Sequence, residues 1–269
     1  MKTRAITAFF FTIVMLGSVF LGAYTFTAFY LLLSLFSLGE FYKLIKTAGI
    51  KPQRNVALVI AALIFIATAG YHFLEFDIKY LLILIPLVFS VFIAELYQKD
   101  KMPFGNLSYT FIGFIYVTLP FCFFYSLGFL NSWSSYNFHL PLAFLLMLWA
   151  NDTGAYLFGR KLGNHKLFER HSPKKTWEGF FGGMVTSLLV SFIISTLFNE
   201  VSPFIWAGMS ILVVTFGTLG DLVESMLKRS LNAKDSGNIL PGHGGLLDRF
   251  DGLLIAAPIV YAYLYLIIG

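Results

Sequence analysis

Nine apolar runs dominate this sequence and limit what the chain can fold into. A helix needs about 20 apolar residues to cross the hydrocarbon core of a bilayer, and each run approaches or exceeds that length. Only 12% of the residues are charged, whereas 58% are hydrophobic, which excludes an ordinary water-soluble fold. The sequence predicts an all-α polytopic membrane protein with about nine transmembrane helices, at roughly 5–24, 26–46, 56–73, 79–97, 107–130, 139–158, 177–198, 203–230 and 247–268.

The positive charges predict which way these helices run. With nine spans, the N-terminus and every second loop lie on the same side of the membrane. Of the 19 lysines and arginines, Lys79 alone falls on the opposite side. Because positive residues concentrate in cytoplasmic loops, we expect a cytoplasmic N-terminus and an outside C-terminus. The first run lacks a small-residue cleavage site, so we interpret it as a helix rather than a signal peptide.

The two halves of the chain differ in where their polar residues lie. Residues 1–105 are interpreted as an N-terminal transmembrane scaffold of about four helices. Residues 106–269 are interpreted as a C-terminal catalytic region of about five helices, with cytoplasmic loops at 159–176 and 231–247. Two acids of the scaffold, Glu40 and Glu95, stand near the ends of their helices. Each either pairs with a nearby lysine, Lys43 or Lys99, or lines a polar cavity.

Four acids lie within the last two predicted helices. Asp221 and Glu224 are three residues apart inside one apolar helix, and Asp248 and Asp251 have the same spacing at the start of the next. This spacing puts each pair on one helix face. Carboxylate clusters with room for water are ligands that suit Mg²⁺ rather than zinc.

The stretch between these helices is rich in bases and glycines. Residues 225–251 read S-M-L-K-R-S-L-N-A-K-D-S-G-N-I-L-P-G-H-G-G-L-L-D-R-F-D. Lysines and arginines among glycines suit phosphate binding, because glycine lets backbone N–H groups approach closely. Acids for a metal together with bases for phosphates indicate phosphoryl or nucleotidyl transfer. The alternative is a solvated, charged loop between two membrane helices.

A second polar group lies in the sixth predicted span and the loop after it. Asn151 and Asp152 fall inside an apolar helix, where an acid must face protein or water. They either form a structural hydrogen bond between helices or line a cavity, and we favour the cavity. The next loop carries S-P-K-K-T-W-E directly before a helix, which Ser172 or Thr176 could cap. A helix N-terminus beside Lys174 and Lys175 suits phosphate.

These motifs together resemble one enzyme family. The pattern S-x2-K-R-x4-K-D-x-G-x2-L-P-x-H-G-G-L-x-D-R-F-D at 225–251 resembles the signature of the CDP-diacylglycerol synthases, also called phosphatidate cytidylyltransferases. N-D-T-G-A-Y and S-P-K-K-T-W-E-G resemble the same family, so the likeness covers roughly 140–265. It implies the reaction of CTP with phosphatidate to give CDP-diacylglycerol and pyrophosphate, in phospholipid biosynthesis.

We assign the candidate site residues from this resemblance and from the chemistry together. Asp221, Asp248 and Asp251 are assigned to Mg²⁺, with a second cation left open. Lys174, Lys175, Lys228 and Arg229 are expected to hold the triphosphate and the lipid phosphate. The remaining candidates contact substrate or orient these groups: Asn151, Asp152, Ser172, Lys234, Asp235 and His243. For His243, phosphate contact or acid catalysis and a turn-forming role are equally open.

The expected partners follow from the same assignment. They are phosphatidate, CTP and the lipid bilayer, with no nucleic acid, and the resemblance implies a homodimer. We expect an integral protein of the bacterial inner (cytoplasmic) membrane, with its active site facing the cytoplasm. A polyprenol kinase or a CDP-alcohol phosphotransferase would use similar groups, but the D-G-x2-A-R pattern of the latter is absent. A secondary transporter also carries intramembrane acids, yet here the polar residues crowd toward one face of the second half.

Overall fold

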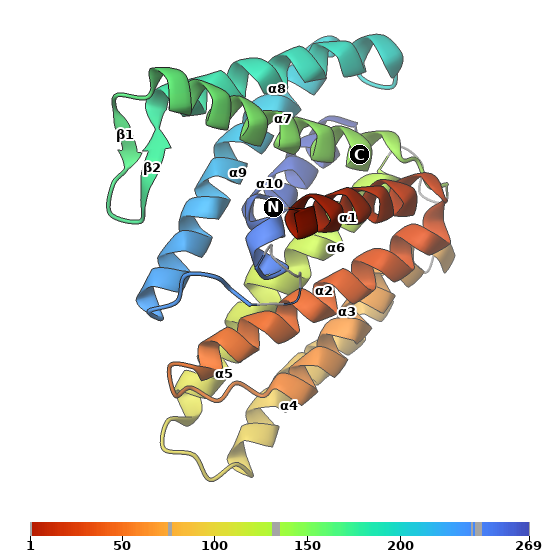
Figure 1. Ribbon diagram of the computed structural model, residues 1–269. Coiled ribbons are helices and arrows are strands. Elements are labelled where there is room, and N and C mark those ends of the chain that lie inside the picture. Colours follow the sequence, from red (N-terminus) through yellow and green to blue (C-terminus); the bar gives the residue numbers. More distant parts are fainter. Residues whose placement is uncertain (1, 75–76, 131–134, 238, 240–243, 269) are drawn as a thin grey trace.

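The computed structural model describes residues 2–74, 77–130, 135–237, 239 and 244–268, and most of them are helical (Figure 1). The first half contains α1 (Lys2–Phe20), α2 (Ala23–Lys46), α3 (Arg54–Leu74), the 3₁₀ segment η1 (Ile78–Ile83), α4 (Leu84–Leu96), α5 (Pro103–Gly113), the π-helical segment η2 (Phe114–Thr118), α6 (Leu119–Ser126) and η3 (Leu127–Phe129). The second half contains α7 (His139–Leu162), strands β1 (Lys166–Phe168) and β2 (Ser172–Thr176), α8 (Trp177–Leu197), α9 (Pro203–Ser230) and α10 (Leu247–Ile268).

The long helices fit a polytopic membrane protein. By length and composition, seven helical stretches of the described chain could cross a membrane: Ala23–Lys46, Arg54–Phe73, Lys79–Leu96, Pro103–Phe129, Trp177–Leu197, Pro203–Ser230 and Leu247–Ile268. The other two expected spans fall on α1, whose apolar part is shorter, and on α7. Large apolar side chains such as Phe92, Leu189 and Leu266 are exposed on the outside of the bundle, as a lipid-facing surface requires. The chain is an integral membrane protein.

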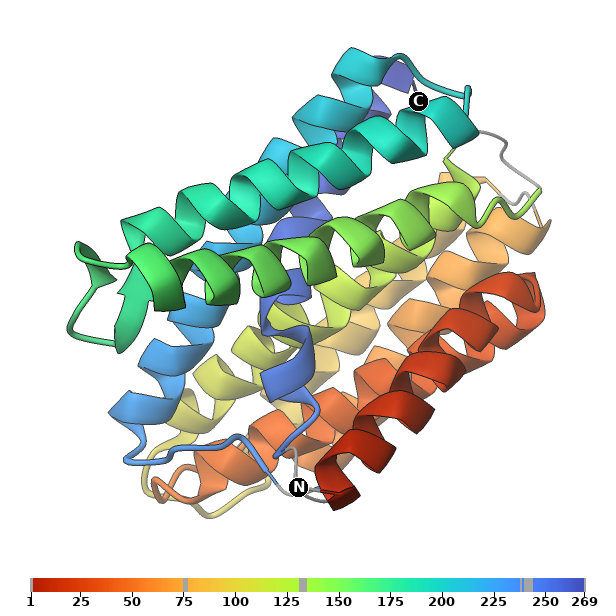
Figure 2. The same cartoon turned by 45° about the horizontal axis from the view of Figure 1, so that its top comes forward.

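Helix α10 lies inside the bundle and joins the two halves (Figures 1 and 2). It packs against α9 on one side and α6 on the other. Its residues Leu253, Ala257, Val260 and Leu264 are almost fully buried. Helix α1 reaches α10 from the other half, with the rings of Phe11 and Phe250 5.9 Å apart. Elements from both ends of the sequence therefore meet at the first turns of α10.

Glycines allow α7 and α8 to pack closely. A methyl group at Gly154 would come 2.8 Å from the carbonyl oxygen of Gly182, and one at Gly183 would come 2.9 Å from that of Asn151. Thr186 Oγ1 donates to Ala150 O across the interface at 2.9 Å. Small residues at such interfaces let two membrane helices come together. This contact fixes the position of Asn151, which is buried.

The predicted loop at 159–176 contains a β-hairpin that the all-α prediction did not include. β1 and β2 pair antiparallel, with Lys166 opposite Thr176 and Phe168 opposite Ser172. Thr176 then caps α8, because its Oγ1 accepts a hydrogen bond from Gly179 N at 3.2 Å. Of the two predicted caps, Thr176 is correct and Ser172 is a strand residue. The end of β2, at Lys175 and Thr176, is more buried than Pro173 and Lys174 before it.

A π-helical turn interrupts the helix that runs through 103–126. Leu119 N donates to Phe114 O, one residue further back than in an α-helix. Pro120 follows directly and has no N–H to donate to the preceding turn, which accounts for the irregular hydrogen bonding. The span predicted at 107–130 therefore consists of four successive helical segments, α5, η2, α6 and η3. The predicted boundary between 105 and 106 falls inside α5.

Candidate active site

A cavity of about 690 Å³ brings together many of the predicted site residues. Its walls come from α1, α7, the hairpin β1–β2, α8, α9 and α10. Its lining includes apolar residues such as Phe11, Met15 and Leu148. It also includes the predicted residues Asn151, Asp152, Lys174, Lys175, Asp221, Asp248 and Asp251. A cavity lined by both kinds of residue suits a ligand that has a polar and an apolar part.

Three carboxylates from three helices face this cavity. Asp152 lies on α7, Asp221 on α9 and Asp251 on α10, and they are near enough to repel one another electrostatically. The backbones of α9 and α10 approach closely here, because a methyl group at Gly220 would overlap the carbonyl of Asp251. Ionised carboxylates that share one cavity are unfavourable neighbours unless a cation lies among them.

A lysine from the hairpin neutralises part of this charge. Lys175 Nζ lies 2.6 Å from Asp221 Oδ2 and 3.5 Å from Thr218 O on the same helix. Lys175 is on β2, so the hairpin brings a base from the α7–α8 connection onto α9. Lys174 precedes it and also lines the cavity. These two lysines and the three acids form a site with both signs of charge.

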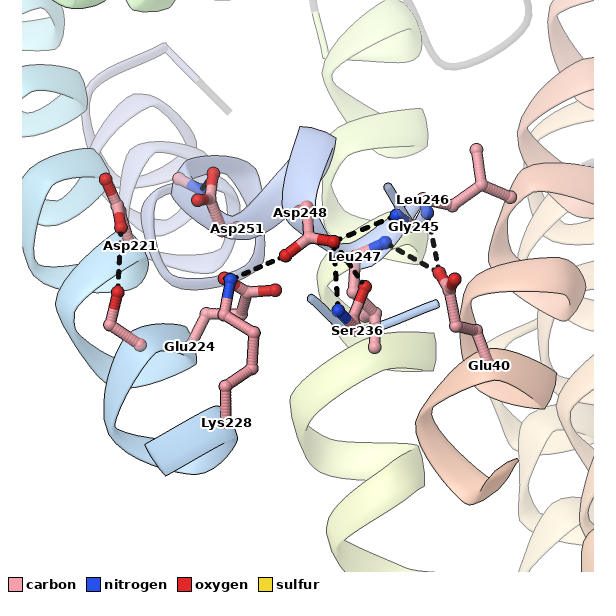
Figure 3. A network of polar contacts seen from close by, with 12 residues as sticks. Glu40, Asp221, Glu224, Lys228, Ser236, Gly245, Leu246, Leu247, Asp248 and Asp251 are labelled. Atoms are coloured by element: carbon pink, nitrogen blue, oxygen red, sulfur yellow. Dashed lines mark hydrogen bonds and ion pairs between the residues drawn. The ribbon is translucent and has the colours of Figure 1, made fainter. Parts of the chain in front are cut away.

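Lys228 lies between two further acids. Its Nζ is 2.5 Å from Asp248 Oδ1 and also forms an ion pair with Glu224 on the preceding turn (Figure 3). The Lys228 side chain is 13% exposed and that of Glu224 is 1% exposed. In this structure the lysine that we assigned to phosphate is therefore the counter-ion of buried carboxylates.

Asp248 also orders the polypeptide around it. Its Oδ2 accepts hydrogen bonds from Ser236 N at 3.0 Å, Ser236 Oγ at 2.9 Å and Gly245 N at 2.9 Å. Gly244 has a φ of +85°, a left-handed conformation that glycine adopts without strain. This turn directs Gly245 N at the carboxylate. Asp248 therefore joins both ends of the connecting loop to the start of α10.

Comparison with known proteins assigns the chain to a family. A sequence profile of the cytidylyltransferase family matches residues 2–267. Phosphatidate cytidylyltransferase from Staphylococcus haemolyticus is 36% identical over 267 residues, which cover 97% of each chain. The proteins of that name from Staphylococcus epidermidis and Staphylococcus aureus are 36% identical over 264 and 263 residues, again 97% of each chain. The chain belongs to the cytidylyltransferase family. The resemblance predicted from residues 225–251 is thereby confirmed.

Several predicted residues of this cytidylyltransferase lie away from the cavity wall. Ser172 is half-buried on β2, and Arg229, Lys234 and Asp235 are exposed at and beyond the end of α9. His243 lies outside the described residues. The arrangement therefore brings together the acids of α7, α9 and α10 with the two lysines of β2, and leaves the bases after α9 at the periphery.

Glu40 contributes to this region of the cytidylyltransferase in a way that the sequence did not indicate. Its Oε2 accepts hydrogen bonds from Leu246 N at 2.6 Å and Leu247 N at 3.1 Å (Figure 3). It takes neither predicted role, since its described contacts are with the backbone and it is not among the residues that line the cavity. The sequence does show an acid inside an apolar helix, but the Leu246 amide that binds it lies 206 residues away in the sequence.

Tyr116 is a second polar residue that we did not single out from the sequence. It lies on η2, with its hydroxyl buried and without a hydrogen-bond partner among the described residues. It interacts electrostatically with Glu224, Asp251 and Asp221. The π-helical turn therefore presents a hydroxyl toward the acids of α9 and α10.

The residues present fit a hard cation held by oxygen ligands. Among the described residues, no three His, Cys, Asp or Glu side chains form a ready-made metal site. Asp221 and Asp251 nevertheless face one cavity and repel one another, which is the arrangement that a divalent cation would stabilise. Asp248 Oδ2 accepts hydrogen bonds from the loop and Oδ1 accepts one from Lys228 Nζ, so Asp248 could bind a cation through Oδ1 only by exchanging Lys228 for it.

Proposed function

We propose that this chain transfers a cytidylyl group from CTP to phosphatidate, forming CDP-diacylglycerol and pyrophosphate. The observation that supports it best is the cavity, whose lining combines Lys175, Asp221 and Asp251 with apolar residues. The relatives named phosphatidate cytidylyltransferase match along 97% of the chain, so the whole molecule is comparable to them. A carrier would not require acids and bases to converge on a single cavity.

The chemistry needs charge neutralisation more than a general base. A phosphate oxygen of phosphatidate attacks the α-phosphorus of CTP, and the bond from that phosphorus to the bridging oxygen breaks as pyrophosphate leaves. The attacking group is already an anion, so no strong base is required. We assign Lys174 and Lys175 to the triphosphate, with Lys175 exchanging Asp221 for phosphate when substrate binds. Lys228 and Arg229 are assigned to the lipid phosphate or the leaving group.

We assign Mg²⁺ to Asp221, Asp251 and Asp248, whose Oδ1 would exchange Lys228 for the cation. When bound, it neutralises phosphate charge and stabilises the leaving pyrophosphate. Asp152 and Asn151, on the facing wall, are assigned to orient these ligands and the substrate. Ser172, Lys234, Asp235 and His243 remain proposed substrate contacts.

The finer membrane arrangement is part of the same proposal. We propose nine spans with a cytoplasmic N-terminus and an outside C-terminus, in the bacterial inner membrane. The distribution of lysine and arginine supports this orientation. The loops 159–176 and 231–247 then face the cytoplasm, where CTP is available. A scaffold at 1–105, a catalytic region at 106–269 and a homodimer complete the proposal.

The test uses purified protein in detergent with phosphatidate, labelled CTP and Mg²⁺. We expect wild type to release CDP-diacylglycerol and pyrophosphate in equal amounts. Asp221→Asn should lower the rate on the order of 10³-fold while the protein stays folded, since a metal ligand is lost. Asp77→Asn, at an exposed surface aspartate, is the matched control and should retain the wild-type rate. A folded wild type without product would refute the activity, and an undiminished Asp221→Asn would refute the site.

A further inference from the structure

We propose, on the basis of the activity proposed above, that Glu40 is a positioning residue of the active site. It holds the first turn of α10 and the loop before it, so that Asp248 and Asp251 face the cavity. Glu40 lies on α2, far from the charged stretch in sequence, and is 3% exposed. It does not line the cavity, and we infer that it acts on the reaction only through α10.

The contact satisfies backbone groups that a helix leaves unpaired. The first N–H groups of an α-helix have no partner within the helix, and α10 begins at Leu247. Glu40 Oε2 accepts from Leu247 N at 3.1 Å and from Leu246 N at 2.6 Å. A carboxylate is also favoured at a helix N-terminus by the helix dipole. One side chain of α2 therefore caps a helix from the other end of the chain.

Two glycines of the charged stretch fit around this carboxylate. A methyl group added at Gly237 or at Gly245 would overlap Glu40 Oε1. Both glycines had suggested close approach to phosphate, but here the group they approach is Glu40. Oε1 has no hydrogen-bond partner among the described residues, so it fills space while Oε2 accepts the hydrogen bonds. The close fit leaves the carboxylate little freedom to turn.

The same segment connects Glu40 to Asp248. Gly245 N donates to Asp248 Oδ2, whereas the next two amides, of Leu246 and Leu247, donate to Glu40 (Figure 3). Three consecutive N–H groups are thus divided between two carboxylates on opposite sides of the chain. Asp251 follows on the first turns of α10. If Glu40 were lost, Asp248 and Asp251 would be free to shift relative to Asp221 on α9.

The expected effect is on turnover rather than on stability alone. A misplacement of about 1 Å in a catalytic group lowers rates by about 10²-fold. If Glu40 were merely structural, its substitution would lower stability and leave the turnover of the folded protein unchanged. Glu95 is a matched control, since it is also 3% exposed but binds Gln53 and Asn106, away from the cavity.

The experiment compares Glu40→Ala, Glu40→Gln and Glu95→Gln with wild type in detergent. It measures kcat, the KM values for CTP and phosphatidate, the thermal unfolding midpoint, and hydrogen exchange of peptides covering 244–252. For Glu40→Ala we expect kcat to fall about 100-fold, with little change in KM for phosphatidate and faster exchange in these peptides. Glu40→Gln should restore kcat to within about tenfold of wild type, because its amide oxygen still accepts from Leu246 and Leu247. Glu95→Gln should keep the wild-type kcat and exchange.

Three outcomes would overturn the inference. They are a folded Glu40→Ala with wild-type kcat, unchanged exchange at 244–252 in that variant, or an equal loss of kcat in Glu95→Gln. If Glu40→Ala does not fold, Glu40→Asp replaces it. The shorter side chain keeps the charge but reaches less far, so an undiminished kcat there also overturns the inference. A folded wild type without product refutes the proposed activity instead, and the wild-type measurement separates that failure from the others.

Discussion

Glu40 and Glu95 are both glutamates of the first four helices, and both are 3% exposed. Their partners differ completely. Glu95 accepts from Gln53 Nε2 at 2.5 Å and from Asn106 Nδ2 at 2.9 Å, so it joins α4 and α5 to the residue that precedes α3. Glu40 accepts from the backbone at the start of α10. Equal burial therefore corresponds to two different roles, one within the first half of the chain and one at the boundary with the candidate active site.

The difference shows that the first half is not a uniform support. Around Glu95, Asn106 Oδ1 also accepts from Lys51 N at 2.8 Å, which closes a polar network near the α3–α5 ends. That network contains no residue of the second half. Glu40 contacts the second half directly, although both acids had the same predicted alternatives. We expect changes to the partner of a buried acid, or to the packing around it, to have larger effects than the loss of a helix cap.

The largest effect is expected from Lys228→Met, which extends the comparison to a third buried glutamate. Glu224 and Asp248 would both lose their counter-ion. Removing one partner of a buried ion pair costs about 3–5 kcal/mol, so the free energy of unfolding should fall by that amount and activity should be lost. Denaturant unfolding in detergent measures the change, with Lys43→Met at an exposed lysine as control. A loss under 1 kcal/mol would show that the pair is not buried in the functional state.

Glu95→Leu should separate stability from catalysis. It leaves the buried amide groups of Gln53 and Asn106 without their acceptor, which costs about 3 kcal/mol for two donors. The thermal midpoint should fall clearly, whereas kcat per folded molecule should stay at the wild-type value. Calorimetry together with a rate assay on the folded fraction tests this. A tenfold loss of kcat with an unchanged midpoint would contradict the contrast with Glu40.

Gly245→Ala tests the fit around Glu40 from the other side. The new methyl group would overlap Ser236 Oγ and the Glu40 carboxylate. Overpacking of this kind costs about 2 kcal/mol, and we also expect kcat to fall as the start of α10 moves. Gly17→Ala is the matched control, since nothing lies within 4 Å of its added methyl group. Equal kcat and stability in the two variants would mean that the loop can relax away from Glu40.

The smallest effect is expected from Thr176→Ala, a local contact within one connection. It removes the hydrogen bond from Gly179 N to Thr176 Oγ1 at the start of α8. Loss of such a cap costs about 1 kcal/mol. The rate should change little unless the hairpin also moves Lys175. Comparing the Thr176→Ala and Thr176→Ser thermal midpoints isolates the hydroxyl, and a midpoint equal to that of wild type in both would exclude the cap as a stabilising contact.

The sequence was most informative where one physical signal dominates. Long apolar runs located the helices, and α8, α9 and α10 begin at the predicted residues 177, 203 and 247. The spacing of acids on α9 and α10, with the resemblance, identified residues that face one cavity. Nine spans, their orientation and the metal remain predictions.

Other features were not accessible from local pattern. The hairpin at 166–176 is short and polar, so its strands have no alternating apolar signal. The π-helical turn before Pro120 depends on hydrogen bonds within a helix that is apolar throughout. The partner of Glu40 is fixed by tertiary packing between the second helix and the last. Sequence can reveal a buried acid, but it does not reveal which backbone the acid binds.

The contact between Glu40 and α10 has a consequence for the order in which the molecule is completed during synthesis. Helix α2 leaves the ribosome well before the amides that bind Glu40, the nearer of which lies 206 residues further along the chain. Until then, Glu40 lacks these donors, and Asp248 and Asp251 do not yet exist beside Asp221. The acidic site is therefore assembled only when the final helix enters the bundle. A chain truncated before α10 would carry an unsatisfied buried carboxylate as well as an incomplete cavity.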